Sequence, residues 1–594
     1  MSAREVLVCS GTACRSAGAV ELHQRLVALI AEHNLGDESL LTETGCMGPC
    51  AQGPLLRVMP DDVLYTQVRP EDAEEIIREH LMEGRVVRRL LWADNESPSS
   101  IPFFTHQRKN VLANSGVIDP DRIEAYEARG GYEALKCALS EMSPEAIIEM
   151  VEQSGLRGRG GAGFPTGRKW QFTRDAPGDT KYVVCNADEG DPGAFMDRAI
   201  LEGDPHAVIE GMAIAARAIA AERGYVYVRA EYPLAIARLE TAIQQAQDHG
   251  WLGSDILGMG STFEIDLRIG AGAFVCGEET ALLASIEGRR GVPRPRPPFP
   301  AQTGLYGRPT LINNVETFAN VRTILRDGAE AYSAVGTASS KGTKVFALAG
   351  QICNTGLVEV PIGTTLRQLV FDIGGGVPEG RRLKAIQIGG PSGGCLPEAL
   401  LDVPIDYESL NEHGAIMGSG GVIVLDDTAC MVNVAQFFLD FTASESCGKC
   451  VPCRVGIATM RDILVRITEG EGELEDLDRL RELSELVSSS SLCGLGQTAP
   501  NPVLSTLRYF EDEYRAHIED GICPSGVCEA LAPAYTIDPE ACKACDKCAK
   551  ACPTDAALGQ PGEPPYVIDE ALCIRCGACF KACPFGAVIR GAGS

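Results

Sequence analysis

Histidine and long apolar stretches are scarce in this chain of 594 residues. Only eight histidines accompany 24 cysteines, so metal sites should be built mainly from thiolates. The most apolar segments, such as 207–221, are interrupted by charges and are too short to cross a bilayer. Met1–Arg4 leads directly into a strand-like segment without the apolar core of a signal peptide. We therefore expect a cytoplasmic protein with no membrane span.

Basic residues are outnumbered, with 53 lysines and arginines against 81 acidic residues and a formal net charge of −28. This balance argues against a nucleic-acid partner, because binding to phosphates needs a basic face. The simplest consequence of the charge is solubility. The length exceeds what one hydrophobic core supports, so the chain should divide into about four or five domains.

The 24 cysteines are the strongest compositional signal. A secreted disulfide scaffold would be much shorter than this chain. In an intracellular protein, cysteines at regular spacings are more often ligands of metals or clusters.

Residues 1–82 predict a small α/β domain, with a strand over 5–9 and a helix over 20–32. Two cysteine pairs, Cys9 with Cys14 and Cys46 with Cys50, each follow a predicted strand. Four thiolates in two loops can hold a 2Fe–2S cluster. A thioredoxin-type redox site would need C-x-x-C, which neither pair has, and zinc remains an alternative. The spacing resembles that of thioredoxin-like 2Fe–2S ferredoxins, including the one that accompanies the flavin subunit of respiratory complex I. Residues 83–110 are interpreted as a linker.

A glycine-rich segment at residues 155–170 has the sequence G-L-R-G-R-G-G-A-G-F-P-T-G-R-K-W. So much glycine indicates backbone with positive φ or in close contact with a ligand, and the cations that follow favour a phosphate nearby. Gly158, Gly160 and Gly163 match G-x-G-x-x-G. However, Ser143 and Pro144 open a helix that ends at Gly155, whereas the dinucleotide fingerprint requires a strand before the glycines. We therefore reject the ordinary dinucleotide-binding motif at this place.

Two further corners follow the glycine-rich segment. A strand over 181–186 ends in N-A-D-E-G-D-P-G, which suits hydrogen bonding to ribose or ribityl hydroxyls, although a solvated acidic turn is the alternative. A strand over 263–269 leads to G-A-G-A-F and then to C-G-E-E-T-A-L, which opens a helix. In the proline-rich stretch 288–309, a basic patch suited to a pyrophosphate is formed by Arg289, Arg290, Arg294 and Arg296.

Together these motifs resemble the NADH-oxidising flavoprotein subunit of respiratory complex I and its relatives in soluble hydrogenases and formate dehydrogenases. The resemblance runs from about Leu112 to Tyr514 and includes several independent motifs in the same order. It implies a Rossmann-like domain for FMN and NADH over residues 111–340. The residues that it implies for FMN are Gly158, Gly160, Lys169, Asn186, Asp188, Glu189, Gly277, Glu278, Asn313, Asn314 and Thr317. The adenine of NADH would lie between Phe164, Phe172 and Phe299, with Glu279 nearby; Gly161, Asp191, Phe274 and Arg296 complete the predicted site.

The chain departs from the complex I pattern at two places. Gly190 and Asp191 stand where complex I commonly has Ser-Glu, and Arg296 stands where it usually has lysine. A carboxylate shortened by one methylene at position 191 bears on the choice between NADH and NADPH, of which we favour NADH.

Residues 341–422 alternate short apolar runs with glycine turns and predict a β-rich, ubiquitin-like domain of the SLBB type, while residues 423–520 predict a helical bundle. Within the bundle, Cys447, Cys450 and Cys453 form C-x2-C-x2-C, and Cys493 can supply a fourth thiolate from a later loop. This pattern is typical of a 4Fe–4S cluster. The family resemblance places that cluster beside the flavin.

Residues 521–532 are interpreted as a linker with a possible structural zinc site. His517, Cys523 and Cys528 would suit zinc if a fourth donor were present, and the resemblance to subunits of bifurcating hydrogenases supports zinc. We expect Cys395 to be the missing ligand; the alternative is two spare cysteines and a surface histidine. Five cysteines without partner spacing should pack as small apolar side chains: Cys137, Cys185, Cys276, Cys353 and Cys430.

The tail, residues 533–594, contains C-x2-C-x2-C-x3-C-P twice. In two-cluster ferredoxins the fourth cysteine of each run ligates the other cluster. One predicted 4Fe–4S cluster is therefore held by Cys542, Cys545, Cys548 and Cys583, and the other by Cys573, Cys576, Cys579 and Cys552.

One 2Fe–2S cluster, three 4Fe–4S clusters and FMN in one chain predict an electron-transfer subunit, in which the flavin takes hydride from NADH and no side chain acts as acid or base. The combination most resembles the β subunit of NAD-linked, electron-bifurcating hydrogenases. Its implied partners are a hydrogenase catalytic subunit, a small 2Fe–2S subunit and ferredoxin in a multimeric complex.

Three alternatives remain open. The first is the β subunit of an NAD-dependent formate dehydrogenase or of a transhydrogenase. The second is a ferredoxin-like relay with a vestigial flavin site, and the third is a scaffold that holds structural metal only.

Overall fold

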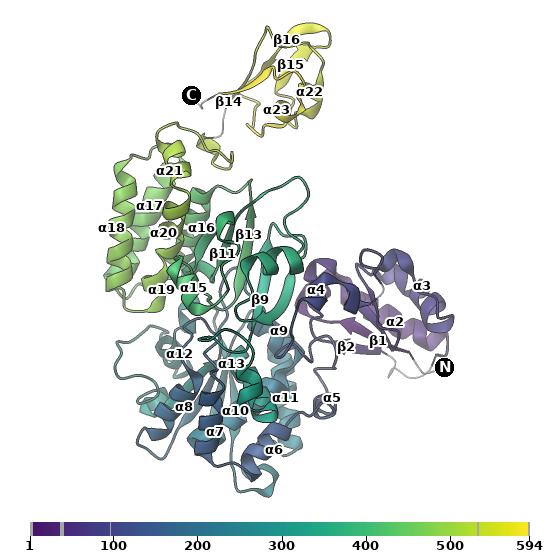
Figure 1. Cartoon of the computed structure of the whole chain (residues 1–594), viewed down its shortest axis with the longest axis vertical. Coiled ribbons are helices and arrows are strands. Elements are labelled where there is room, and N and C mark those ends of the chain that lie inside the picture. The colour runs from purple at the N-terminus through teal and green to yellow at the C-terminus, as the bar shows by residue number, and fades with distance from the viewer. Residues whose placement is uncertain (1–3, 36–40, 96, 532–533, 592–594) are drawn as a thin grey trace. The chain divides into compact units, whose positions relative to one another are not determined.

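A computed structural model describes residues 4–35, 41–95, 97–531 and 534–591 (Figure 1). Three predicted domain boundaries lie outside the described residues: residues 1, 533 and 594. Met1–Ala3 also lie outside them. The chain divides into two compact units, one ending at Val424 and the other beginning at Leu425. Each unit is described by itself.

The N-terminal domain is a four-stranded sheet in the order β2-β1-β3-β4. Strand β1 pairs parallel with β2 and antiparallel with β3. Helix α2 (Val20–Glu32) buries Leu22, Leu26, Leu29 and Ile30, an i, i+4, i+7, i+8 stripe that explains why the segment is helical. The strands are β1 (Glu5–Cys9), β2 (Leu41–Thr44), β3 (Leu56–Met59) and β4 (Val63–Tyr65). The remaining helices are α1 (Thr12–Cys14) and α3 (Ala73–Glu75).

Helices fill the segment between this domain and the next sheet. They are α4 (Pro102–Thr105), α5 (Ile123–Glu127), α6 (Glu133–Ser140), α7 (Pro144–Gln153) and α8 (Thr166–Asp175). The Ser143 hydroxyl caps α7 by accepting from the Ala146 N–H, and Gly155 follows with φ +68°. The predicted helix ahead of the glycine-rich segment is confirmed.

The next sheet is parallel and has the order β7-β6-β5-β8. Parallel strands covered on both faces read as continuous apolar runs, and β5 and β6 fit this pattern. Every residue of α10 (Pro205–Ile219) except Arg217 is buried, so this helix lies at the centre of the core. The strands are β5 (Tyr182–Ala187), β6 (Arg223–Arg229), β7 (Glu264–Gly270) and β8 (Thr310–Asn314). The other helices are α9 (Met196–Gly203), α11 (Pro233–Asp248), α12 (Glu279–Ile286), α13 (Val315–Asp327) and α14 (Ala329–Ser333).

A five-stranded mixed sheet follows, in the order β10-β9-β13-β11-β12. The first strand of this domain thus lies between the second and the fifth, with the third and fourth beyond, which is the order of a ubiquitin-like sheet. Strand β13 runs parallel to β9, while β10 is antiparallel to it. The strands are β9 (Thr343–Gly350), β10 (Gly356–Pro361), β11 (Leu383–Ile388), β12 (Gly394–Pro397) and β13 (Gly421–Asp426), with α15 (Tyr407–Glu412) before the last.

The second unit begins with a helical bundle, as the periodicity predicted. Its helices are α16 (Met431–Ser444), α17 (Ile457–Thr468), α18 (Glu475–Ser490), α19 (Gly494–Thr498), α20 (Asn501–Tyr509) and α21 (Glu511–Ile518). The tail repeats a strand–helix–strand unit: β14 (Ala534–Ile537), α22 (Lys547–Ala551) and β15 (Ala557–Gln560), then β16 (Glu563–Ile568), α23 (Ala578–Ala582) and β17 (Val588–Gly591). The two halves interlock, since β14 pairs with β17 and β15 with β16.

Among the described residues, no helix is both long enough and apolar enough to cross a membrane.

Candidate functional site

The predicted flavin residues lie at the carboxyl edge of the parallel sheet. Asn186 is the penultimate residue of β5 and Asp188 follows that strand. Phe274 and Gly277 follow β7, and Asn313 and Asn314 end β8. Ligands of open parallel sheets bind at this edge.

The glycine-rich segment packs against the end of β8 and the start of α13. A Cβ at Gly160 would lie 3.1 Å from Asn314 Cβ, and the Arg159 N–H donates to Thr317 Oγ1 at 2.8 Å. Gly161 and Gly163 have φ of +116° and +62°, a region that other residues rarely adopt. By contrast, the nearest protein atom to a Cβ at Gly158 is 3.6 Å away. The loop therefore needs glycine for its conformation at two positions, whereas a Cβ at Gly158 would make only an ordinary van der Waals contact with the protein.

The acidic loop after β5 is ordered by side-chain bonds to the other corners. Asn186 Nδ2 donates to the Gly277 carbonyl at 2.9 Å, and its Oδ1 accepts from the Asp188 N–H at 3.1 Å. Glu189 accepts from the N–H groups of Asp197 and Arg198 at 3.1 and 3.2 Å. Both carboxylate oxygens of Glu189 thus bind the N-terminus of α9. The acidic loop has an ordered conformation at this edge of the sheet.

The corner after β7 carries a charged cluster. Glu278 is the N-cap of α12 and accepts from the Thr280 and Ala281 N–H groups. Glu279 is 2.6 Å from Arg296 and 3.9 Å from Lys169. Burial lowers the pKa of Lys169, whose Nζ also donates to the Ile312 carbonyl at 3.1 Å. Two cations and one carboxylate therefore meet beside the glycine-rich loop.

The departure from the complex I pattern at Gly190 has a steric reason. A Cβ there would lie 2.2 Å from Arg229 Nη1 and 2.7 Å from the Phe274 ring. The next residue, Asp191, is half-buried. Loss of solvation, and after it the charge of Glu189, raises the pKa of Asp191 to about 7. Its carboxyl group therefore changes charge in the physiological range.

Three predicted aromatic residues stay at the surface of this region. Phe164, Phe172 and Phe299 have exposed fractions of 43, 49 and 50%, and the rings of Phe164 and Phe172 lie 6.4 Å apart. Arg168 and Arg296 lie over the Phe172 and Phe299 rings. Exposed rings suit stacking of an adenine, and the cations beside them suit contact with the phosphates of the same nucleotide.

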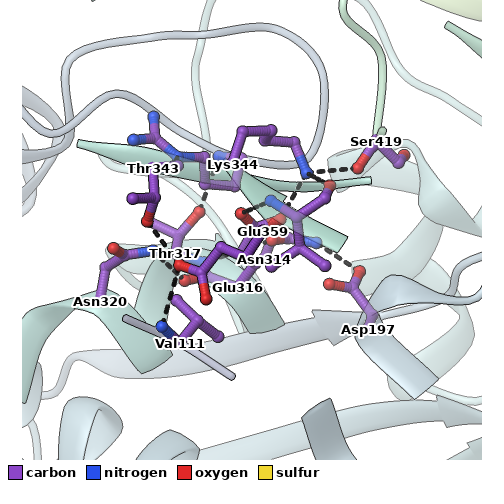
Figure 2. A network of polar contacts seen from close by, with 12 residues as sticks. Val111, Asp197, Asn314, Glu316, Thr317, Asn320, Thr343, Lys344, Glu359 and Ser419 are labelled. Carbon is purple, nitrogen blue, oxygen red and sulfur yellow. Dashed lines mark hydrogen bonds and ion pairs between the residues drawn. The ribbon is translucent and has the colours of Figure 1, made fainter. Parts of the chain in front are cut away.

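A buried polar network anchors this edge of the site (Figure 2). Asn314 Nδ2 donates to Asp197 at 2.5 Å, and Trp170 Nε1 donates to Asn313 Oδ1 at 2.9 Å. Behind them, Lys344 of β9 forms an ion pair with Glu316 of α13, both fully buried. The network joins α9, α13 and β9 and so holds the asparagines of β8 in position.

These contacts fit a flavin mononucleotide. The glycine-rich loop offers open backbone at Gly158, the amides and carboxylates offer donors and acceptors for hydroxyls, and Lys169 with Arg296 offers charge for a phosphate.

The first four cysteines meet at the loops of the N-terminal domain. Cys46 Sγ and Cys50 Sγ are 3.8 Å apart, and contact with Cys46 followed by burial raises the pKa of the Cys50 thiol. Cys9 contacts both Cys14 and Cys46. These loops touch the end of α9: Glu202 accepts from Thr12 N at 3.1 Å, and Gly45 lies directly on Gly203. The structure therefore brings together the thiolates required for a 2Fe–2S cluster.

The cysteines of the helical bundle also converge. Burial raises the pKa of the Cys453 thiol, and neighbouring Cys450 and Cys447 add to the shift. Cys493 is the N-cap of α19, and a Cβ at Gly496 in the same helix would lie 3.0 Å from Cys453 Cβ.

Each half of the tail has a small cavity lined by cysteines. One is lined by Cys573, Cys576, Cys579 and Cys552, and the other by Cys542, Cys545, Cys548 and Cys583. Three cysteines of one run and the fourth of the other thus face each cavity.

The candidate zinc ligands require a correction. The structure brings Cys430 to His517, Cys523 and Cys528, with all four donor atoms within 4.8 Å of one another. Cys430 therefore completes the set, so the expectation of Cys395 as ligand is wrong, as is that of Cys430 as an apolar packing residue. Cys395 instead lies on β12, paired with Gln387 of β11.

The geometry of this group matches a tetrahedral zinc site. Zinc–ligand bonds of ~2.3 Å to sulfur and ~2.0 Å to nitrogen place two sulfurs ~3.8 Å apart and sulfur and nitrogen ~3.5 Å apart. Cys430 Sγ is 3.8 Å from Cys528 Sγ and 3.4 Å from His517 Nε2. His517 Nδ1 is 2.7 Å from the Glu513 carbonyl, which leaves Nε2 as the ligand atom. His517 is buried, so it is not the surface histidine of the alternative interpretation.

Family models match the parts of the chain that carry the flavin residues and the cluster cysteines. Four family models match: Thioredoxin-like [2Fe-2S] ferredoxin at 2–81, Nuo51 FMN-binding domain at 151–323, NADH-ubiquinone oxidoreductase-F iron-sulfur binding region at 433–517, and 4Fe-4S binding domain at 535–557 and 566–589.

Similar proteins come from both hydrogenases and NADH dehydrogenases. The NADP-reducing hydrogenase subunit HndC of Solidesulfovibrio fructosivorans is 57% identical over 77% of this chain and 93% of its own length. An NADH-quinone oxidoreductase subunit of Rhizobium meliloti is 49% identical over 70% of this chain and 98% of its own. A solved NAD+-reducing [NiFe]-hydrogenase in the H2-reduced state has a chain that is 31% identical, with a TM-score of 0.62 over 87% of this chain and 84% of that one.

The fold and the site thus define an FMN- and iron–sulfur-containing oxidoreductase subunit. The chain belongs to the family of NADH-oxidising flavoprotein subunits that includes the flavin subunit of complex I and the hydrogenase subunit HndC. The expected fold class is confirmed, with its thioredoxin-like 2Fe–2S domain, FMN-binding domain, 4Fe–4S region and ferredoxin-type tail.

Proposed function

We propose that this chain is the β subunit of an electron-bifurcating hydrogenase that exchanges electrons between NAD(H), ferredoxin and a partner catalytic subunit. The observation that carries the proposal is the similarity to a hydrogenase subunit, which covers 93% of that relative at 57% identity. The two cysteine-lined cavities of the tail support it, because they offer an exit for electrons to a separate carrier.

In this proposal the carboxyl edge of the parallel sheet holds FMN and NADH. Gly158, Gly160 and Gly161 give the flavin room, while Asn186, Asp188, Gly277, Asn313, Asn314 and Thr317 surround its polar groups. When bound, the flavin supplies hydride exchange with the nicotinamide and one-electron exchange with clusters. Lys169 and Arg296 compensate phosphate charge, and the exposed phenylalanines receive the adenine. Glu189 acts indirectly by fixing α9.

The cysteine groups are proposed as one 2Fe–2S and three 4Fe–4S sites, with Cys430, His517, Cys523 and Cys528 holding structural zinc. Complete loading gives about 14 iron atoms per chain. Iron and zinc analysis of the purified protein tests this count, and an iron content near zero would leave only the scaffold alternative.

Bifurcation is tested on the anaerobic complex reconstituted with its catalytic and small 2Fe–2S subunits. We expect H2 to reduce NAD+ only when oxidised ferredoxin is present, because the two acceptors are coupled. Reduction of NAD+ by H2 alone would refute bifurcation and leave the family assignment intact.

Two alternatives have distinct outcomes. If the purified native complex contains a formate dehydrogenase in place of a hydrogenase, the chain serves that enzyme. If the isolated chain yields no extractable flavin and no NADH–ferricyanide activity, it is a relay with a vestigial flavin site. The ordered acidic loop and the Glu279–Arg296 pair argue against the relay.

A further inference from the structure

A basic pocket of about 500 Å³ lies in the first unit, and no residue assigned to the flavin, the nucleotide or a cluster lines it. Five of its lining side chains are cationic and one is anionic: Arg108, Lys109, Arg129, Arg322, Arg326 and Asp327. This concentration of positive charge occurs in a chain whose net charge is −28. Like charges brought together repel one another, so the pocket is unfavourable unless an anion compensates it.

The pocket is deep enough to contain a buried guanidinium. Arg322 is 6% exposed, its Nη2 is 3.3 Å from Asp204, and its Nε has no hydrogen-bond partner among the described residues. Asp204 also accepts from Asn114 Nδ2 at 2.8 Å. The charge of Glu210 also acts on Arg322, and the Tyr126 ring centre lies 5.1 Å from its guanidinium carbon. The Nε–H of Arg322 is the part of the guanidinium that stays available to a ligand.

Of the other cations, Arg326 is paired with a carboxylate of the lining, whereas Arg108, Lys109 and Arg129 form no ion pair with the residues that line the pocket. Asp327, the one anionic side chain of the lining, is bonded to its neighbour Arg326 at 2.7 and 2.9 Å. Arg129 donates to the neutral Asn114 Oδ1 at 2.7 Å, and Lys109 lies 5.7 Å from the centre of the Phe104 ring. Arg108 and Arg129 are exposed at the mouth of the pocket.

The wall that carries Arg108 and Lys109 is held in place by a buried carboxylate. Glu359 of β10 accepts from the N–H groups of Asn110, Val111 and Leu112 at 2.8, 3.0 and 2.9 Å. Figure 2 shows Glu359 with Val111. It also accepts from Thr343 Oγ1 at 2.5 Å, and Thr343 lines the opposite wall. The pocket is thus preformed, which reduces the entropy cost of binding.

We infer that this pocket binds a phosphorylated small molecule of about mononucleotide size. Its volume falls within the range of small-molecule sites, roughly 300–1,000 Å³. Several guanidinium groups that converge on one cavity recognise phosphate oxygens by bidentate bonds. The concave shape and the buried Arg322 favour a small anion over an acidic protein surface, which would meet the exposed arginines but not the floor.

Calorimetric titration of the full, cofactor-loaded chain with inorganic pyrophosphate and with AMP tests the inference. NAD+ is present at saturation, so that the nicotinamide site is occupied. We expect one molecule bound per chain, with an affinity that falls as salt rises. In Arg108→Gln/Arg129→Gln, affinity should fall about tenfold or more because two charged contacts are lost. In Arg122→Gln, which removes an exposed arginine outside the pocket, affinity should be unchanged.

Hydrogen exchange gives a second readout that does not depend on a buried variant. Pyrophosphate should protect the amides of residues 108–114 and 322–335, and leave those of the glycine-rich loop unchanged. The inference is overturned if neither probe binds below about 1 mM, or if binding is equal in the double variant. It is also overturned if the double variant weakens only the binding of an acidic protein such as ferredoxin. None of these outcomes depends on the proposed function.

Discussion

Asp191 is a side chain whose charge state depends on the site around it. Loss of solvation and the adjacent Glu189 raise its pKa to about 7, so the carboxyl group is neutral below that pH and negative above it. In the proposed binding mode, a negative group beside the nucleotide repels the additional 2′-phosphate of NADPH. The relatives include proteins named for NADP as well as for NAD+, which makes this residue the sharpest test of cofactor choice.

We predict that Asp191→Asn raises the NADPH-to-NADH ratio of kcat/KM by about tenfold, because one repulsive charge is removed. In the unaltered protein the ratio should fall as pH rises through about 7, and the variant should lack this fall. Steady-state kinetics with both nucleotides from pH 6 to 8 measure it (~1 unit on either side of the pKa). Asp266→Asn, at an exposed position, is the control. Equal ratios in all three proteins would rule out a role for Asp191.

Cys430 offers a second test at the residue scale. Cys430→Ala should reduce zinc from about one atom per chain to nearly none, because a structural site needs all four ligands. Cys395→Ala should retain zinc. Metal analysis by mass spectrometry, with thermal unfolding beside it, decides between the two cysteines, and zinc loss in Cys395→Ala alone would restore the sequence-based expectation.

In the glycine-rich loop, one glycine is needed for backbone conformation and another for contact with the flavin, and two variants distinguish these roles. Gly158→Ala should leave the melting temperature almost unchanged, since the new Cβ has 3.6 Å to the nearest protein atom, yet reduce bound FMN because the Cβ enters the flavin's space. Gly163→Ala should destabilise the fold by about 1–3 kcal/mol, since φ is +62° and the Tyr407 ring would lie 2.6 Å from the Cβ. Flavin content and thermal unfolding are measured on both variants. Full flavin content in Gly158→Ala would move FMN away from this loop.

The ion pair between α13 and β9 stabilises the edge on which the asparagines of β8 lie. Lys344→Met leaves the buried Glu316 without its partner and should lower the free energy of unfolding by about 3–5 kcal/mol. Lys344→Met with Glu316→Gln should recover much of that loss, because the uncompensated charge is gone and the amide oxygen can still accept from Val345 N. Chemical denaturation measures the free energy of unfolding of the single and the double variant. Equal losses in the two variants would show that the unpaired charge of Glu316 has little effect on stability.

Local signals explain what the sequence could predict at this scale. The Ser143 cap and Gly155 define α7, and the repeated cysteine spacing predicts which cysteines face each cavity of the tail. The missed features depend on contacts between distant segments. Cys430 meets His517 across 87 residues, and Glu359 holds residues 110–112 across 247 to 249. No spacing rule covers such separations, because they follow from the packing of whole domains.

For the whole molecule, the tail should be separable from the flavin chemistry. Its core is made of its own residues, including Tyr566, Ala587 and Val588. A chain that ends at Leu531 should therefore lose about eight iron atoms and the transfer of electrons to ferredoxin. It should keep NADH–ferricyanide activity, which needs only the flavin site. Loss of that activity in a protein with full flavin content would show that electrons leave through the tail even to a small acceptor.

Helix α9 has a consequence for how the cofactors are acquired. It spans eight residues, or about 12 Å, and is held at one end by Glu189 of the acidic loop and at the other by Thr12 beside Cys14. A ligand that binds only the ordered form stabilises that form. Because one short rigid element is shared, insertion of the first cluster and uptake of the flavin should favour each other reciprocally. Half-assembled protein would then be the less populated species.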